Sequence, residues 1–320
     1  MNCDLQTTVK LLKTKDNILI ITHKHPDGDA IGSSFALYFA LLKMGKKVIV
    51  DIGNKLPSIY NFVCDGNYSN KHYFEPDFIV SVDLADTKLL LEHLKFCENK
   101  IDLAIDHHAS NTLYANNTLL YKNAASTTEL LYDVLVNLLG EENIDERIAS
   151  CLYLGLATDT GCFKYSSVTA KSHYVAANLL KQGADFVNIN KKMFDTKSKK
   201  KLQIEQIVTS NIEYYFNGKC ALIFISKSLQ NEFNVSYEEL EGFSGLPIQI
   251  EGVEIGITIK EKENEYKVSI RTSENYDASE ICKMFGGGGH KRAAGCTLKG
   301  DFKAVKEQLL LTLFKFIKSE

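Results

Sequence analysis

The chain has 320 residues, a length at which a single hydrophobic core usually gives way to two domains of roughly 100–200 residues each. Hydrophobic residues make up 45% and charged residues 24%, which is typical of a globular protein and excludes a collagen-like, mucin-like or wholly disordered chain. The net charge of −3 gives no basic field that could hold duplex nucleic acid, although very short oligonucleotides stay open as ligands.

The sequence shows no sign of secretion or membrane insertion. No apolar run approaches the ~20 residues that span a bilayer, and the start MNCDLQTTVK lacks the basic flank and apolar core of a signal peptide. The eight cysteines form no CxxC pair and have no regular spacing, so we expect free thiols. We therefore expect a cytoplasmic protein that contacts no membrane.

The first half of the chain alternates short apolar runs with helical patterns. The runs predict buried strands at residues 16–23, 46–52, 78–84 and 101–108. Helices are predicted between them, at about 30–44 and at 87–96. Strands that read as continuous apolar runs and alternate with helices indicate a parallel sheet with helices on both faces.

Two further helices are predicted after this sheet. Ser126 and Glu129 have the spacing of a capping box, which opens a helix that Gly140 ends. Another helix, roughly 144–157, leads to the segment ATDTG at 157–161.

The second half has a different texture. From about Phe186 the chain becomes rich in lysine and then amphipathic, which indicates a linker helix. Asn217-Gly218, between two strand-like runs, predicts a β-hairpin. A second hairpin, a glycine run, a short strand and a C-terminal helix follow, at 252–273, 286–289, about 293–298 and 301–318. The predicted division is a domain at 1–190, a linker helix at 191–212 and a smaller α+β domain at 213–320.

Polar clusters follow the predicted strands of the first half, at the edge where open parallel sheets bind ligands. These clusters are His23 to Asp29, Asp83, Asp106 to His108, and Asp159. Carboxylates crowded at one edge would repel one another unless cations neutralise them. A set of His nitrogens and Asp oxygens without Cys suits a divalent ion such as Mn²⁺. That many carboxylates require two ions, and ions roughly 3.5–4 Å apart promote the hydrolysis of phosphoesters.

Five segments carry a resemblance to a known family. HKHPDGDAIGS, VDLADT, DHH and ATDTGCF, in that order, resemble the four motifs of the DHH phosphoesterases, and GGGGHKRAAG resembles the signature of the associated DHHA1 domain. The motifs span residues 23–295, nearly the whole chain. The resemblance implies an α/β fold, with a parallel-sheet DHH domain that has helices on both faces and a smaller α+β DHHA1 domain.

The resemblance also implies a role for each motif residue. Six residues would hold two Mn²⁺ ions, with Co²⁺ or Mg²⁺ as substitutes: His23, Asp27, Asp29, Asp83, His107 and Asp159. Asp83 would bridge the two ions, and His108 would contact the scissile phosphate, so both are expected to be catalytic. Asp106 would orient a ligand histidine, and His25 is expected not to be a ligand.

The glycine run at 286–289 is predicted to bind the part of the substrate that does not react. Glycines let backbone N–H groups approach an anion closely, and neighbouring cationic side chains add charge-assisted bonds. The resemblance implies that this set binds the part of a nucleotide that does not react: Arg271, Gly287, Gly288, Gly289, His290 and Arg292.

Length and layout are most similar to the short-oligoribonucleotide hydrolases of the family, which commonly also remove phosphate from adenosine 3′,5′-bisphosphate. The resemblance thus implies a hydrolase of short RNA or dinucleotides, and the exposed linker helix could support a homodimer. One alternative is a phosphodiesterase for cyclic di-AMP or its linear product pApA, and a more distant one is a nucleotide sensor without catalysis. The sequence leaves open the preferred substrate, the polarity of digestion, the physiological metal and the oligomeric state.

Overall fold

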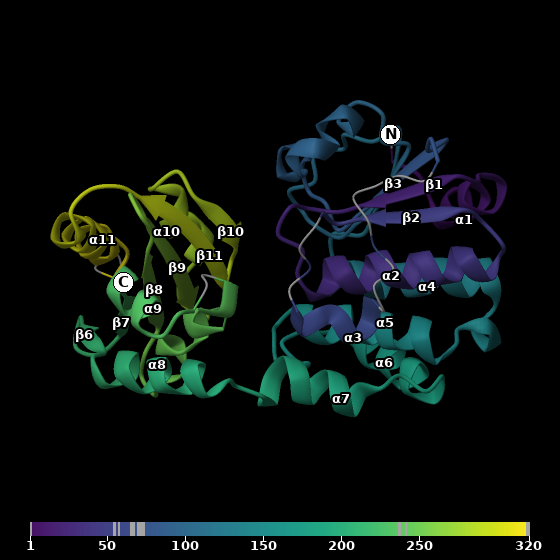
Figure 1. The fold of residues 1–320 in the computed structure, drawn as a ribbon. Coiled ribbons are helices and arrows are strands. Elements are labelled where there is room, and N and C mark those ends of the chain that lie inside the picture. Colours follow the sequence, from purple (N-terminus) through teal and green to yellow (C-terminus); the bar gives the residue numbers. More distant parts are fainter. Residues whose placement is uncertain are drawn as a thin grey trace. The chain divides into compact units, whose positions relative to one another are not determined.

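The computed structural model describes residues 2–53, 56, 58–64, 68, 74–235, 238–240 and 242–317. The chain divides into two units, Met1–Thr196 and Lys197–Glu320, and each has its own hydrophobic core (Figure 1). Within the described residues, no helix combines the length and the apolar character that a membrane span needs.

A five-stranded parallel sheet forms the centre of the first unit. Its strands are β1 (Ile18–Ile21), β2 (Val48–Asp51), β3 (Phe78–Val82), β4 (Leu103–Asp106) and β5 (Asn117–Leu120), in the order β2-β1-β3-β4-β5. The four strands predicted from apolar runs are confirmed. The edge strand β5 was not predicted, because its four residues include two polar side chains and its ends are only half-buried.

Helices cover one face of this sheet in two layers. They are α1 (Leu5–Thr14), α2 (Gly28–Lys43), α3 (Asn61–Cys64), α4 (Thr127–Leu139), α5 (Glu146–Asp159), α6 (Ala170–Lys181) and α7 (Phe186–Asn190), which a π-helical turn, η5 (Lys191–Asp195), extends. Figure 1 shows α2 and α4 directly under the strands and α5 and α6 below them. The layers pack closely at Gly32, where a Cβ would lie 2.4 Å from the carbonyl oxygen of Cys151. Glycine is therefore required where α2 crosses α5.

The other face is covered by short 3₁₀ helices, η2 (Thr87–Leu89) and η3 (Glu92–Cys97), and two more 3₁₀ turns, η1 (Ser58–Tyr60) and η4 (Glu141–Asn143), lie elsewhere in the unit. The helix predicted at 87–96 is instead these two 3₁₀ helices, η2 and η3. Leu90 and Leu91 between the two turns are extended, with ψ of 149° and 146°. The carbonyl of Leu89 accepts the N–H of Lys24 (2.7 Å), so it is not used for the fourth residue along the chain as in an α-helix.

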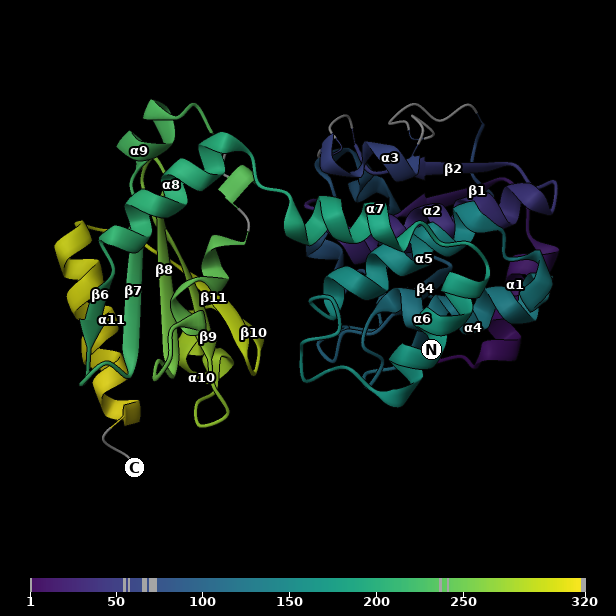
Figure 2. The same cartoon turned by 90° about the horizontal axis from the view of Figure 1, so that it is seen from below.

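The second unit is built on a six-stranded mixed sheet. Its strands are β6 (Glu213–Tyr215), β7 (Cys220–Ile225), β8 (Ile255–Glu261), β9 (Tyr266–Thr272), β10 (Gly288–His290) and β11 (Ala293–Leu298), in the order β10-β11-β9-β8-β7-β6 (Figure 2). Only the pair β7–β8 is parallel. The predicted hairpin turn is confirmed, with Asn217 at φ 55° and Gly218 at φ 87°.

The glycine run differs from the loop expected there. Gly288 and Gly289 form the edge strand β10 together with His290, opposite Gly295, Ala294 and Ala293 of β11. Two glycines of the run therefore lie in a ladder of backbone hydrogen bonds rather than in a free turn.

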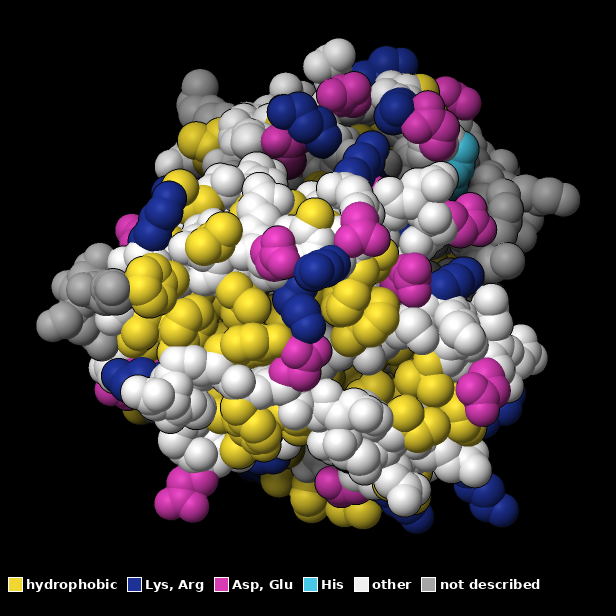
Figure 3. Space-filling model, turned by 90° about the vertical axis from the view of Figure 1, so that its left-hand side faces the viewer, with side chains coloured by type: hydrophobic (Ala, Val, Ile, Leu, Met, Phe, Trp, Pro, Cys, Tyr) yellow, Lys and Arg dark blue, Asp and Glu magenta, His cyan; other side chains and the backbone are white. Residues whose placement is uncertain are grey.

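Helices cover both faces of the second sheet. They are α8 (Lys199–Ser210), α9 (Lys227–Glu232), α10 (Ala278–Lys283) and α11 (Phe302–Ile317), with 3₁₀ turns η6 (Glu238–Leu240), η7 (Phe243–Gly245) and η8 (Pro247–Gln249). α10 and α11 pack on one face, whereas α8 and Phe243 of η7 pack on the other. Tyr214 of β6 and Leu311 of α11 are largely exposed, and Figure 3 shows hydrophobic side chains mixed with charged ones on the side of these elements.

Candidate metal centre

The first motif begins where β1 ends and α2 begins. Asp27 is the N-cap of α2, and its Oδ1 accepts the N–H groups of Asp29 and Ala30, both at 3.1 Å. The Nε2 of His23 lies 4.0 Å from the same oxygen. The helix terminus thus holds the Asp27 carboxylate beside the ring of His23.

The second motif places Asp83 directly after β3, in an uncommon backbone conformation. Its φ is +53°, a left-handed value that aspartate tolerates better than most residues. Hydrogen bonds from another loop stabilise this turn, because the carbonyl of Leu84 accepts bonds from the Asn111 amide (3.2 Å) and the Tyr114 hydroxyl (2.7 Å). The buried Asp83 carboxylate is therefore supported by a fixed loop.

The third motif follows β4 and presents two histidine rings. The Nδ1 of His107 lies 3.1 Å from the carbonyl oxygen of Ala124, so the proton belongs on Nδ1 and Nε2 is the nitrogen available to a metal. The Nδ1 of His108 instead lies 2.7 Å from Oδ1 of the buried Asp106. Asp106 thereby orients the ring of His108, and it also accepts the backbone N–H of His107 (2.8 Å).

The fourth motif ends a helix. Asp159 is the last residue of α5, and its Oδ2 lies 3.3 Å from Nε2 of His107. Earlier on the same helix, a Cβ on Gly155 would lie 2.6 Å from Oδ1 of Asp29. The glycine leaves the room that the Asp29 carboxylate occupies between α2, α4 and α5.

The Asp29 carboxylate is fully buried at the N-terminus of α4. Its Oδ2 accepts the N–H of Thr127 (2.6 Å), and its Oδ1 accepts the N–H of Thr128 (2.9 Å). Free N–H groups at a helix start favour an anion. Ser126 caps this helix as predicted by accepting the N–H of Glu129, whereas the Glu129 carboxylate accepts the hydroxyl of Ser172 on α6.

All six predicted ligands meet at the carboxyl edge of the sheet. Among the described residues, three sets of side chains bring donor atoms within 4.8 Å of one another. The sets are His23, Asp27 and Asp83; Asp29, His107 and Asp159; and Asp83, His107 and His108. Asp83 belongs to one set with His23 and Asp27 and to one with His107 and His108, and His107 also belongs to the set with Asp29 and Asp159. His25 belongs to none of the three.

Burial and mutual repulsion act on the carboxylates. Burial, followed by the charges of Asp83 and Asp159, raises the pKa of Asp27 to about 7, although 55% of its side chain is exposed. The same causes raise the pKa of Asp29 well above its usual value. Burial and the charge of Asp83 also raise the pKa of Asp159. Three acids thus resist ionisation in the protein alone.

The histidines carry the compensating positive charge. Burial would raise the pKa of Asp83, but the nearby ring of His23 and the charges of His108 and His107 lower it to about 2. Burial would lower the pKa of His107, but its bond to Asp159 and the neighbouring carboxylates raise it to about 10. Protons balance the acids here, and divalent cations can take their place, so the donor set fits such ions.

The structure places the predicted substrate-binding residues of the second unit in different surroundings. Arg271 and His290 are both aligned with Ala293 across β9, β11 and β10, so their side chains lie on the same face. The Arg271 guanidinium also donates to the Ser244 hydroxyl (3.1 Å).

Arg292 is engaged with the backbone. Its Nη1 donates to the carbonyl oxygens of Ser273 and Tyr276, the latter at 2.9 Å. Gly287 is packed, since a Cβ there would lie 2.3 Å from the carbonyl oxygen of Gly295, whereas Gly288 faces open space. Truncating Arg292 would therefore disturb the local fold as well as any contact with a ligand.

The sequence interpretation missed the residues that hold the ligands in place. Thr127, Asn111 and the Ala124 carbonyl contact the motif side chains, yet none belongs to a quoted motif. The position of Thr127 in the chain could have indicated its role. A helix that starts after a strand of a parallel sheet brings its N-terminus to the ligand-binding edge.

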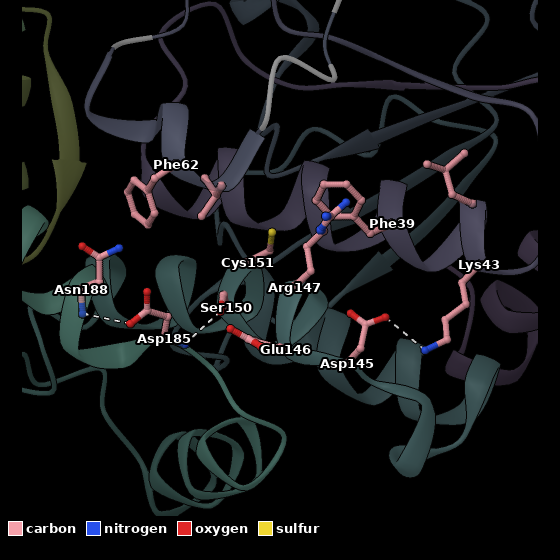
Figure 4. Close-up of a pocket in the computed structure, with 12 residues that line it drawn as sticks. Phe39, Lys43, Phe62, Asp145, Glu146, Arg147, Ser150, Cys151, Asp185 and Asn188 are labelled. Atoms are coloured by element: carbon pink, nitrogen blue, oxygen red, sulfur yellow. Dashed lines mark hydrogen bonds and ion pairs between the residues drawn. The ribbon is translucent and has the colours of Figure 1, made fainter.

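A cavity of about 760 Å³ lies away from the motif residues, between α2, α3, α5 and α7 (Figure 4). Three of the charged residues that line this cavity interact with other side chains of the protein. Lys43 pairs with Asp145 at 3.1 Å, and the Arg147 guanidinium lies 4.8 Å from the centre of the Phe39 ring. No histidine or motif residue lines this cavity in the described part of the chain.

Two family models match the chain. The model of the DHH family N-terminal domain matches residues 17–156, and the model of the DHHA1 domain matches residues 217–319. The bifunctional oligoribonuclease and PAP phosphatase NrnA of Thermus thermophilus is 31% identical over 314 residues, which cover 96% of this chain and 92% of that protein. The Bacillus subtilis protein of the same name is 23% identical over 302 residues, or 93% of each chain.

A solved structure has the same fold over nearly its whole length. The crystal structure of an exopolyphosphatase-related protein from Bacteroides fragilis superposes with a TM-score of 0.88 at 26% identity, covering 98% of this chain and 95% of that one. The fold, the matched domains and the relatives agree. The chain therefore belongs to the DHH/DHHA1 family of phosphoesterases and is an enzyme that hydrolyses phosphate esters.

Proposed function

We propose that the chain is a two-metal hydrolase of short oligoribonucleotides that also removes phosphate from adenosine 3′,5′-bisphosphate. The observation that carries the proposal is the position of Asp83, whose carboxylate belongs to one donor set with His23 and Asp27 and to another with His107 and His108. His23 and Asp27 would hold one ion, Asp29, His107 and Asp159 the other, and Asp83 would bridge them. Such ions supply charge stabilisation and an activated water for the attack on phosphorus.

The protein side chains prepare the site in three ways. The N-terminus of α4 holds Asp29, and the Ala124 carbonyl turns Nε2 of His107 inward. Asp106 keeps a proton on Nδ1 of His108, and together with Asp83 it raises the pKa of that ring against the effect of burial. A protonated His108 can donate a charge-assisted bond to a phosphoryl oxygen and stabilise the charge that develops there.

The proposed metal is Mn²⁺. Three of the candidate donors around Asp83 are imidazoles, the remainder are carboxylates, and no thiol joins them among the described residues. Mixed nitrogen and oxygen sites of this kind suit Mn²⁺, with Co²⁺ or Mg²⁺ as substitutes, better than Ca²⁺, which prefers larger cages of oxygen alone.

The proposed substrate class rests on the relatives and on the second unit. NrnA proteins that match most of this chain are named as oligoribonucleases and PAP phosphatases. Arg271 and His290, on one face of the second sheet, can bind the part of a nucleotide that does not react. Cyclic di-AMP and its linear product pApA are the alternative substrates, and a substrate panel separates them.

The test is hydrolysis of that panel by the full chain in Mn²⁺: RNA of two to five nucleotides, adenosine 3′,5′-bisphosphate, pApA and cyclic di-AMP. We expect the short RNAs and the bisphosphate to be turned over fastest. Asp83→Asn keeps the size of the side chain and tolerates the left-handed backbone, but it removes the bridging charge, so all activities should fall at least a hundredfold.

Asp145→Asn is the matched control. It removes the same charge from an exposed residue of the same unit, and asparagine caps α5 as well as aspartate does. Its activity should equal that of the wild type. Activity of Asp83→Asn above a tenth of the wild-type value would refute the bridged two-metal site, and turnover of cyclic di-AMP alone would refute the proposed substrate class.

A further inference from the structure

Thr127 contacts two of the predicted metal ligands at once. Its backbone N–H donates to Oδ2 of Asp29 (2.6 Å), and its hydroxyl donates to Oδ1 of Asp83 (2.9 Å). The residue is fully buried at the first position of α4. One residue thus joins Asp29 of the first motif to Asp83, whose carboxylate lies between the rings of His23 and His107.

The hydroxyl groups of the neighbouring residues make other contacts. The hydroxyl of Thr128 lies 2.8 Å from that of Ser126, which in turn accepts the N–H of Glu129. Only the backbone of Thr128 reaches a predicted ligand, through its N–H bond to Asp29. The hydroxyl of Thr127 therefore has a contact that helix capping does not explain.

The Thr127 hydroxyl contacts the oxygen of Asp83 that lies on the side of His107. Oδ1 of Asp83 lies 3.8 Å from Nε2 of His107, whereas Oδ2 lies 3.7 Å from Nε2 of His23. A carboxylate that bridges two ions must direct one oxygen to each side. A hydrogen bond to one defined oxygen fixes the rotation of the carboxylate plane, and a β-branched threonine holds its hydroxyl in few rotamers.

We propose that Thr127 is a positioning residue, whose hydroxyl fixes the Asp83 carboxylate so that each oxygen faces one of the two donor sets. The inference rests on the two-metal site proposed above. It assigns α4 two tasks at this edge: the backbone at its start holds Asp29, and the first side chain orients Asp83.

The test compares Thr127→Val with Thr127→Ser and Thr118→Val in the full chain. Valine has the shape of threonine without the donor and keeps the N–H bond to Asp29. Serine keeps the hydroxyl. Thr118→Val removes the buried hydroxyl of a threonine on β5, which has no hydrogen-bond partner in the described part of the chain.

The first readout is Mn²⁺ binding, from the electron paramagnetic resonance signal of the free ion during titration. Thr127→Val should weaken binding by about 10- to 100-fold, the usual effect of removing a group that orients a metal ligand. Thr127→Ser should restore most of the affinity, and Thr118→Val should bind as the wild type does. At saturating Mn²⁺, Thr127→Val should lower kcat more than it changes KM, because the substitution affects the metal site and not the binding of the substrate.

Wild-type affinity for two ions in Thr127→Val, or an equal loss in Thr118→Val, would overturn the inference. If Thr127→Val does not fold, Thr127→Ala replaces it under the same criteria. The two-metal site itself is tested separately by Asp83→Asn in the same titration. Normal binding of two ions by Asp83→Asn would refute that site, whereas a loss in Asp83→Asn without a loss in Thr127→Val would refute only the role of Thr127.

Discussion

Single residues set the balance of charge at the candidate metal centre. Asp27 and Asp29 have raised pKa values because of burial and neighbouring carboxylates, and His107 has a raised pKa because carboxylates surround it. In the metal-free protein near neutral pH, His107 is protonated and Asp27 is partly protonated. Since metal ligands must be deprotonated, ions and protons compete for the same atoms.

We therefore predict that Mn²⁺ binding releases protons and weakens as the pH falls. A pH of 7 is close to the pKa of Asp27, which is about 7. It is well below the pKa of His107, which is about 10, so His107 is still protonated. At least about one proton should leave, so the association constant should fall tenfold or more per unit of pH. Isothermal titration calorimetry in buffers of different ionisation enthalpy measures this number, and identical heats in all buffers would contradict it.

At the scale of elements, the glycine run is a strand edge in which each glycine has its own environment. A Cβ on Gly287 would meet the Gly295 carbonyl at 2.3 Å and Cβ of Cys296 at 2.6 Å, whereas a Cβ on Gly288 would meet nothing within 4 Å. The first glycine is required for packing of the turn on β11. The second is free to accept a side chain.

The pair predicts a difference in stability. Gly287→Ala should lower the free energy of unfolding by about 1–3 kcal/mol, as overpacking does in cores. Gly288→Ala, at an exposed position, should stay within about 0.5 kcal/mol of the wild type. Urea unfolding followed by circular dichroism measures both, and equal stability of the two variants would show that the turn relaxes around the added methyl.

The elements also show how far the sequence determines the site. Continuous apolar runs predicted four of the five parallel strands, and the polar residues after them could be assigned to one edge, because parallel strands bring their carboxyl ends together. The segment 87–96 was not predictable from its leucines. Its conformation depends on the bond from Lys24 to the Leu89 carbonyl, a tertiary contact that overrides helix propensity.

The contacts between motifs were also outside the reach of the sequence. Thr127 and Asp83 are 44 positions apart, and nothing in either segment specifies that a hydroxyl meets a carboxylate. The left-handed backbone of Asp83 likewise depends on Tyr114 and Asn111, which approach from another loop. The domain limits at 190 and 212 and the roles of the site residues stay predictions.

At the scale of the whole molecule, the candidate metal centre lies in the first unit. The donor sets found among the described residues lie within residues 23–159, and the second unit has a separate core. We predict that Mn²⁺ stabilises the first unit by about 2.7 kcal/mol for each bound ion at a hundred times that ion's dissociation constant. Hydrogen exchange followed by mass spectrometry should show slower exchange in peptides of β1, β3, β4 and α4. Equal protection of β7 to β9, or protection that persists in Asp83→Asn, would contradict this.

The central claim is that two ions share Asp83, and anomalous X-ray scattering from crystals grown with Mn²⁺ tests it most directly. Data collected at the manganese absorption edge should show two peaks roughly 3.5–4 Å apart, the usual separation in two-metal hydrolases. One peak should lie beside His23 and Asp27, the other beside Asp29, His107 and Asp159, and one oxygen of Asp83 should face each. A single peak, or two peaks of which only one contacts Asp83, would contradict the account.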